Sequence, residues 1–246
     1  MERRHVFSST AGLAEAVCAH IAQDSAQAKG RGQRYTLALA GGATPRLLHE
    51  AMVSSQWMKT FCWDAMEFFF GDERMVPPDH RNSNYRMAYE TLFSHAPIAP
   101  EHIHRIKGEL SPAMDAAIDY EKQLRRLLTP LEDGFPQFDL VLLGLGADGH
   151  VASLFPDTDI LNEREKWVAA TYVQRLEAWR VSLTFPVLNR ARKIFVLVTG
   201  ESKSDIVAAV FNEASSADLP VKRLAPRGEL HWFIESKAAR HVAATA

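Results

Sequence analysis

The stretch 138–153, FDLVLLGLGADGHVAS, constrains the fold more than any other part of this chain. Its first half is a short apolar run with the length and character of a strand buried on both faces of a parallel sheet. Its second half changes abruptly to glycines 144, 146 and 149, with Asp148 and His150 among them. Glycines permit tight turns and close approach to a ligand, and open α/β sheets bind ligands at the carboxyl ends of their strands. We therefore expect the chemistry of the protein at this turn.

The same alternation of apolar strand, turn and amphipathic helix recurs along the chain. Further strands are expected at 5–8, 35–40, 66–70, 103–106, 167–173, 181–185, 193–199 and 230–234, and helices at 13–28, 85–92 and 113–128. Strands that alternate with helices are typical of parallel sheets. The sequence predicts an α/β fold, a single doubly wound and mainly parallel sheet with helices on both faces, in one domain spanning 1–246.

The amino-acid composition limits the classes of partner that we expect for this protein. The 246 residues carry a formal net charge of −2, so no basic surface for nucleic acid or an anionic membrane is indicated. The two cysteines, Cys18 and Cys62, are too few for a disulfide framework. No run approaches the roughly 20 apolar residues of a membrane span, and no signal-peptide core is visible. We expect a cytoplasmic protein, a monomer or small homo-oligomer, with no nucleic-acid or membrane partner.

Two strand-to-helix junctions have the character of anion sites. Gly41 and Gly42 are followed by Ala43, Thr44 and Pro45, and Thr44 is expected to cap the helix with Pro45 at its first position. Free backbone N–H groups and the helix dipole favour a phosphate there, although a plain turn is an equal alternative. At the second junction, Gly200 to Ser204, Lys203 in the first turn would oppose the dipole unless an anion were bound.

The strand at 66–70 runs into Asp72-Glu73-Arg74 and then into a polar loop, 76–85, that is longer than a minimal connection. A charged triplet at this position is most often a solvated loop, whereas long loops are often functional. Asn84 is expected to cap the helix that follows. On the residues alone, both interpretations of the triplet stay open.

Several chemistries are conceivable at the central turn. Its Gly144-x-Gly146-x-x-Gly149 pattern resembles a dinucleotide fingerprint, but no ribose-binding acid follows and Pro156 interrupts the expected helix. Metal ligation lacks a supporting His or Cys cluster, and Ser153 lacks a GxSxG elbow. Acid–base work by His150, oriented by Asp148, remains, against the alternative of a structural histidine.

The chain resembles the 6-phosphogluconolactonases, whose fold is shared with glucosamine-6-phosphate deaminases and isomerases. The motifs that carry the resemblance are LALAGGATP at 37–45, GDER at 71–74, SNY at 83–85, GLGADGHVASLFP at 144–156, RVSLTFP at 180–186 and TGESK at 199–203. They stand in the family's order and extend over most of the chain. The resemblance implies an ester hydrolase that needs no cofactor or metal and opens 6-phospho-D-glucono-1,5-lactone to 6-phosphogluconate in the pentose phosphate pathway.

The resemblance also implies roles for individual residues. His150 would be the general base that activates water, and Asp148 would orient it or help to shuttle the proton. The phosphate would be bound by the following groups: the backbone of Gly42, Ala43 and Thr44, and the side chains of Arg74, Arg180 and Lys203. The supporting residues would be Gly41, Asp72, Gly146 and Gly149.

Two alternatives remain. A deaminase or isomerase of the same fold would carry a ring-opening glutamate before the proline, in a segment that resembles DGHIAFNEP, but that position here is Phe155. A sugar-phosphate sensor would keep the cations and would have no need of the Asp148/His150 pair. Asp72 does not discriminate between lactonase and deaminase.

Overall fold

Six parallel strands form the centre of the molecule in a computed structural model that describes residues 2–212 and 217–241. The strand order is β1-β9-β8-β5-β2-β3. The bounds are β1 Glu2–Phe7, β2 Tyr35–Leu39, β3 Met66–Phe70, β5 Leu140–Gly144, β8 Lys193–Val198 and β9 Glu229–Glu235. Every neighbouring pair is parallel, so the carboxyl ends of all six strands lie at one edge of the sheet.

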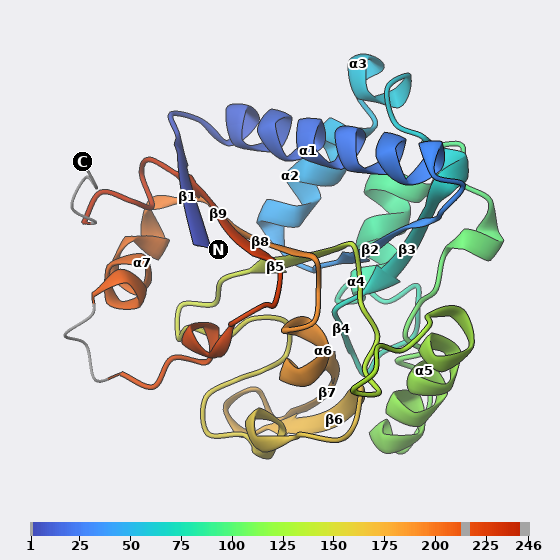
Figure 1. Cartoon of the computed structure of the whole chain (residues 1–246). Helices are drawn as coiled ribbons and strands as arrows, with labels where there is room; N and C mark the ends of the chain where they lie inside the picture. The colour runs from blue at the N-terminus through green and yellow to red at the C-terminus, as the bar shows by residue number, and fades with distance from the viewer. Residues whose placement is uncertain (1, 213–216, 242–246) are drawn as a thin grey trace.

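Helices cover both faces of this sheet. The helix α1 (Thr10–Gly30) lies along one face together with α2 (Ala43–Met52), whereas α6 (Phe185–Leu188) and α7 (Ser204–Phe211) lie on the other side (Figure 1). The other helices are α3 Ser55–Met58, α4 Asn84–Ala88 and α5 Ala113–Leu127. Both the parallel sheet and the helices on its two faces confirm the fold class expected from the sequence.

The central strands are almost inaccessible to water. In β5, Leu140 to Leu143 are all buried, as a run of consecutive apolar residues predicts for a strand covered on both faces. The hydroxyl of Tyr120 on α5 donates to the carbonyl of Phe70 and accepts from its N–H, at 3.0 and 2.9 Å. These bonds fix the end of β3, where the chain enters the segment that carries Asp72 and Arg74.

A second sheet of three strands, β4-β7-β6, departs from the expectation of a single sheet. Its strands are β4 Asp72–Arg74, β7 Ala178–Leu183 and β6 Val168–Val173, and both pairings are antiparallel. The strands β6 and β7 are antiparallel because the connection between them is short: parallel neighbours need a long crossover, whereas a tight turn makes a hairpin. The triplet 72–74, expected to be a loop, is the edge strand that joins this hairpin.

Smaller differences concern the ends of elements. The segment 103–106 is no strand; only Ile103 forms a single bridge, to Phe68. After the central glycine turn the chain makes only a short 3-10 turn at Asp159–Asn162, in keeping with the helix-breaking effect expected of Pro156.

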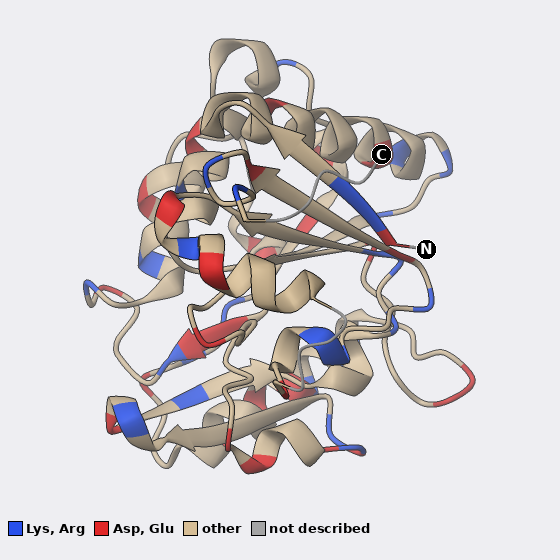
Figure 2. Ribbon diagram, turned by 90° about the vertical axis from the view of Figure 1, so that its left-hand side faces the viewer, with Lys and Arg blue, Asp and Glu red and all other residues tan. Residues whose placement is uncertain are grey.

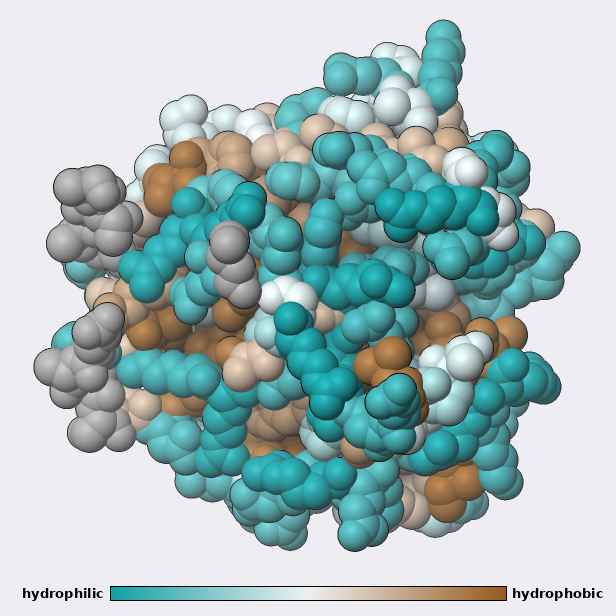
Figure 3. All heavy atoms as spheres, viewed as in Figure 1, coloured by the Kyte–Doolittle hydropathy of each residue, from teal (hydrophilic) through white to brown (hydrophobic). Residues whose placement is uncertain are grey.

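Charged and apolar residues are both distributed widely over the molecule. Lysine, arginine, aspartate and glutamate are interspersed over the ribbon (Figure 2), and apolar residues form separate patches on the face in Figure 3. In the part of the chain that the structure describes, no helix is both long and apolar enough to cross a membrane.

Candidate active site

A pocket of about 380 Å³ opens at the carboxyl edge of the large sheet. Its walls come from the segments after four neighbouring strands, β8, β5, β2 and β3. The lining residues are Ala40, Gly41, Gly42, Ala43, Thr44, Pro45, Asp72, Arg74, Gly144, Leu145, Gly146, His150, Ala152, Leu197, Val198, Thr199, Ser202 and Lys203. This is where open α/β sheets bind ligands, and nine of the twelve residues predicted for the site lie here.

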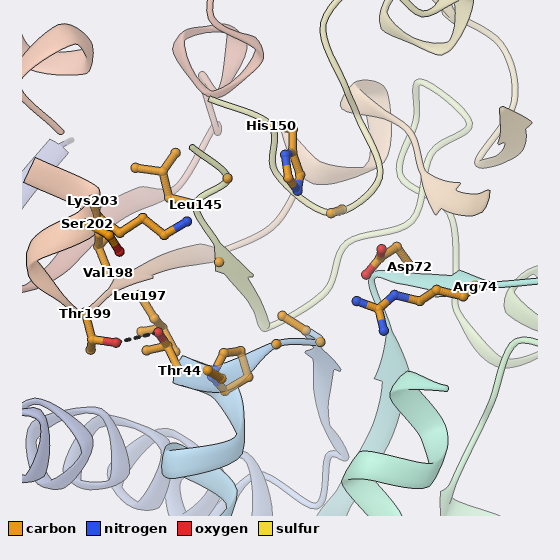
Figure 4. A pocket seen from close by; sticks show the side chains of 18 residues that line it. Thr44, Asp72, Arg74, Leu145, His150, Leu197, Val198, Thr199, Ser202 and Lys203 are labelled. Carbon is orange, nitrogen blue, oxygen red and sulfur yellow. Dashed lines mark hydrogen bonds between the residues drawn. The ribbon is translucent and has the colours of Figure 1, made fainter. Parts of the chain in front are cut away.

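His150 projects into this pocket from the glycine turn after β5, between Lys203 on one side and Asp72 with Arg74 on the other (Figure 4). Its Nδ1 lies 2.5 Å from Oδ1 of Asp148. A carboxylate only accepts hydrogen bonds, so Nδ1 is the protonated nitrogen and Nε2 is left as the acceptor. The pair therefore has the geometry of an oriented general base.

Glycine at 146 makes this arrangement possible. A Cβ at Gly146 would lie 1.9 Å from Nδ1 of His150 and 2.6 Å from Oδ1 of Asp148. The backbone N–H of Gly146 donates to the carbonyl of His150 at 2.9 Å and closes the turn. Gly149 has a φ of 80°, a conformation that side chains with a Cβ rarely adopt.

Asp148 is a carboxylate under ordinary conditions. Partial burial acts to raise its pKa, but the hydrogen bond and charge of His150 and the charge of Arg175 outweigh burial, so the pKa lies below its ordinary value. On the other side of the imidazole, the ring of Phe155 stacks on His150 with centroids 4.0 Å apart. The imidazole is thus fixed by a carboxylate at its edge and an aromatic ring against its face.

The N-terminus of α2 forms the floor of the pocket, but its cap differs from the expected one. Gly42, with a φ of 105°, is the N-cap, so the prediction that Thr44 caps the helix is wrong. A residue with a Cβ would be strained in this conformation, so a glycine suits position 42. The helix therefore begins earlier than the capping preference of Thr44 predicted. Thr44 instead shares a hydrogen bond with Thr199 at 2.7 Å (Figure 4), which ties the loops after β2 and β8 together.

Lys203 forms one cationic side of the pocket. It ends the 3-10 turn Glu201–Lys203 and immediately precedes α7, and its side chain points into the pocket beside Ser202 (Figure 4). Together with the N-terminus of α2, this side offers an ammonium group and backbone N–H groups to an anion.

Arg74 forms the opposite cationic side, and Arg180 stands directly across from it in the β4–β7 ladder. Arg180 does not line the pocket itself. Burial, followed by the charge of Arg74, lowers its pKa from the ordinary arginine value. Two like charges directly opposite in a ladder repel each other, and a bound anion would relieve that repulsion.

Asp72 is held from both sides. Its Oδ2 accepts from the hydroxyl of Ser153 at 2.6 Å, and its Oδ1 accepts from the side-chain amide of Asn84 at 3.1 Å. Asn84 therefore does not cap α4 as expected; Ser83 does, through its hydroxyl. Asp72 lies in the wall of the pocket as a fixed, buried acceptor rather than as a solvated loop residue.

Sequence reasoning missed several residues of the site. Thr199 and Ser202 line the pocket from the TGESK segment. Because this segment is one of the motifs that carry the family resemblance, all of its residues could have been named as candidates for the site. Arg175 contacts Asp148, and no local pattern marked it, since its position depends on the β6–β7 turn. In the described residues, no group of three or more His, Cys, Asp or Glu side chains is arranged to bind a metal ion.

Comparison with known proteins decides the family. Residues 8–232 match the family model described as glucosamine-6-phosphate isomerases/6-phosphogluconolactonase. The chain belongs to this family. It is 36% identical to human 6-phosphogluconolactonase over 248 residues, 96% of this chain and 92% of that protein. It is also 36% identical over 245 residues to a probable chloroplastic 6-phosphogluconolactonase of Oryza sativa, covering 95% of this chain and 74% of that protein.

A solved structure supports the same placement. The 6-phosphogluconolactonase of Trypanosoma brucei superposes on this chain with a TM-score of 0.87 and 28% identity, covering 99% of each chain. The family match and the superposition both agree with the parallel sheet and with the pocket at its carboxyl edge.

Proposed function

We propose that this protein is a 6-phosphogluconolactonase, which hydrolyses 6-phospho-D-glucono-1,5-lactone to 6-phosphogluconate in the pentose phosphate pathway. The observation that carries the proposal is the Asp148–His150 pair, directed into a pocket with cations on two sides, in a chain 36% identical to the human enzyme over nearly the whole of both chains. The reaction is a carboxylic ester hydrolysis.

His150 is the general base. Its Nε2 takes a proton from water while the water oxygen forms a bond to the lactone carbonyl carbon. When the tetrahedral intermediate collapses, the bond from that carbon to the ring oxygen breaks, and the proton passes from the imidazolium to the departing oxygen. Asp148 orients the imidazole and stabilises its transient charge, and such catalysis typically contributes about 10²–10⁴-fold.

The phosphate binds at the side of the pocket formed by Lys203 and the backbone of Gly42, Ala43 and Thr44. Helix N-termini with free N–H groups favour phosphate, and an ammonium group adds a charge-assisted hydrogen bond. Arg74 approaches the bound substrate from the opposite side, and Arg180 adds positive potential behind it. Gly41, Asp72, Gly146 and Gly149 support the loops that hold these groups.

The residues described need no metal or cofactor for this chemistry, since the lactone is already an activated ester. The deaminase alternative requires a proton-transferring group where Phe155 stands, and the stacking of Phe155 on His150 fills that position with an apolar ring. A binding-only sensor would have no use for the Asp148–His150 hydrogen bond. We further propose that the protein acts in the cytoplasm, as a monomer or small homo-oligomer without nucleic-acid or membrane partners.

The proposal is tested by a lactone-opening assay on the purified protein without added metal or nucleotide. The lactone is generated in situ from glucose-6-phosphate and its dehydrogenase, and the spontaneous rate is subtracted. We expect acceleration by the wild type, lost by about 10²-fold or more in His150→Ala, while 6-phosphogluconate still binds to the variant. Wild-type protein without lactonase activity, but with release of ammonia from glucosamine-6-phosphate, would establish the deaminase instead.

A further inference from the structure

Arg175 lies in the tight turn between β6 and β7, far along the chain from the glycine turn, yet it contacts Asp148. Its Nη2 lies 2.6 Å from Oδ2 of that carboxylate. The other carboxylate oxygen of Asp148, Oδ1, accepts a hydrogen bond from Nδ1 of His150, with 2.5 Å between the nitrogen and the oxygen. Asp148 therefore bridges a guanidinium on one side and the imidazole on the other.

The ion pair with Arg175 compensates the charge of a buried carboxylate oxygen. Oδ2 of Asp148 is buried and accepts no hydrogen bond of good geometry within residues 2–212 and 217–241, so the charge of Arg175 is what offsets it. A buried charge without a partner is costly, so this contact favours the observed orientation of the carboxylate. The side chain of Arg175 is 53% exposed, so water weakens this ion pair relative to a fully buried one.

A second contact leads from Arg175 to His150. The guanidinium carbon lies over the ring of Phe155, 5.1 Å from its centroid, and that ring stacks on the imidazole at 4.0 Å. The imidazole is thus enclosed by two groups, Asp148 and Phe155, and Arg175 touches both of them.

The hairpin accounts for the position of Arg175. Gln174–Leu176 form a 3-10 turn, and Glu177 closes it with a φ of 46° between the paired residues Val173 and Ala178; Arg180 follows two residues along the ladder, opposite Thr171. One hairpin therefore carries Arg180, beside Arg74, and Arg175, beside Asp148.

We propose that Arg175 is a positioning residue for the Asp148–His150 pair: it fixes the carboxylate and offsets part of its negative charge, so that Asp148 orients the imidazole without holding it in its protonated form. This inference rests on the proposed function and extends it to a residue outside the pocket lining. The other charged groups that face the imidazole across the pocket are Asp72, Arg74 and Lys203.

The sign of the effect follows from Coulomb's law. Loss of the positive charge leaves the negative charge of Asp148 less balanced, and protonation of the neighbouring imidazole becomes easier. The acid limb of the kcat/KM profile then moves to higher pH, and activity measured on that limb falls by about twofold or more, the size of a charge interaction that water screens.

The test compares Arg175→Gln, Arg175→Lys and the control Gln174→Ala, which alters an exposed neighbour in the same turn. The readouts are the pH profile of kcat and KM and, without substrate, the NMR titration of the His150 ring, assigned by its loss in His150→Gln. We expect the midpoint and the acid limb to move up in Arg175→Gln, with KM near the wild-type value, and to return towards wild type in Arg175→Lys.

The outcomes separate the two proposals. A titration midpoint in Arg175→Gln equal to the wild type would overturn the role of Arg175, whatever the activity. A change confined to KM would also overturn it, because a distorted hairpin would act through Arg180 and Arg74 on substrate binding and not on the Asp148–His150 pair. If the wild type had no lactonase activity, but the His150 midpoint still moved in Arg175→Gln, the Arg175 inference would stand and the proposed reaction would be removed.

Discussion

The imidazole of His150 fills the space that a side chain at Gly146 would need, because a Cβ on Gly146 would lie 1.9 Å from Nδ1 of the imidazole. The glycine therefore has two functions in the turn after β5: it shapes the backbone, and it leaves room for the Asp148–His150 hydrogen bond. The consequence can be measured directly.

Gly146→Ala should reduce kcat by about 10²-fold or more, because the new methyl group displaces the imidazole or separates it from Asp148. KM should change little, since Lys203 and the N-terminus of α2 are untouched. The matched control is Gly30→Ala at the end of α1, where a Cβ meets nothing within 4 Å. Equal kcat values for Gly146→Ala and wild type would show that the close contact has no catalytic importance.

Lys203→Ala should raise KM by about tenfold or more, since a hydrogen bond to a charged group contributes about 1.5–3 kcal/mol. Arg180→Ala should raise KM less, by a few-fold, because Arg180 does not line the pocket and acts through its field beside Arg74. Steady-state kinetics of both variants give the order, with the exposed Lys59→Ala as control. The reverse order of effects would place the phosphate at the Arg74 side of the pocket.

Glu73→Gln should lower the free energy of unfolding by about 2 kcal/mol. The Glu73 carboxylate is buried and accepts four hydrogen bonds, from the backbone N–H groups of Arg74, Asn84 and Tyr85 and from the hydroxyl of Ser83. An amide has one oxygen, and its NH₂ group would face donors. Urea denaturation measures the loss, and exposed Glu132→Gln is the control. A stability within a few tenths of a kcal/mol of wild type would contradict this reading of the network.

His49 should make the protein less stable below neutral pH. Complete burial, followed by the charge of Arg46, lowers its pKa to about 3 in the folded protein, whereas an unfolded chain has the ordinary value of 6.5. The unfolded state therefore binds a proton between these values that the folded state does not. Stability contributed by neutral His49 is complete above pH 6.5 and declines as the pH falls towards 3, by about 2 kcal/mol at pH 5.

The measurement is the free energy of unfolding of wild type and His49→Gln between pH 5 and 7. The variant lacks the titrating group, so its stability should fall less steeply on acidification. Exposed His95→Gln should retain the slope of the wild type. Parallel slopes for His49→Gln and wild type would mean that other groups dominate the acid sensitivity.

The sequence predicted the central sheet well because its strands are short apolar runs. The strand at 66–70 has the expected bounds, and the run before the glycine turn is β5. Residues adjacent to these strands, such as His150 and Lys203, could be assigned to one pocket because parallel strands share an edge. The likeness to a known family then gave the reaction, which neither periodicity nor composition specifies.

The small sheet and the caps were harder to predict because they depend on contacts between distant segments. The strand 72–74 has no apolar pattern and exists only because the β6–β7 hairpin pairs with it. Asn84 has the side chain of a good cap, but its amide is used by Asp72, and the serine before it takes that place. The ion pair of Arg175 with Asp148 likewise has no local signature.

The pocket takes its walls from segments as far apart as Gly41 and Lys203, each following a different strand of the large sheet. No short piece of the chain therefore contains a working part of the site. During folding, these segments come together only when β8, β5, β2 and β3 have paired in register, and such long-range parallel pairings form slowly. Recovery of activity after refolding should consequently lag behind the first appearance of helix, and it reports the completion of the sheet.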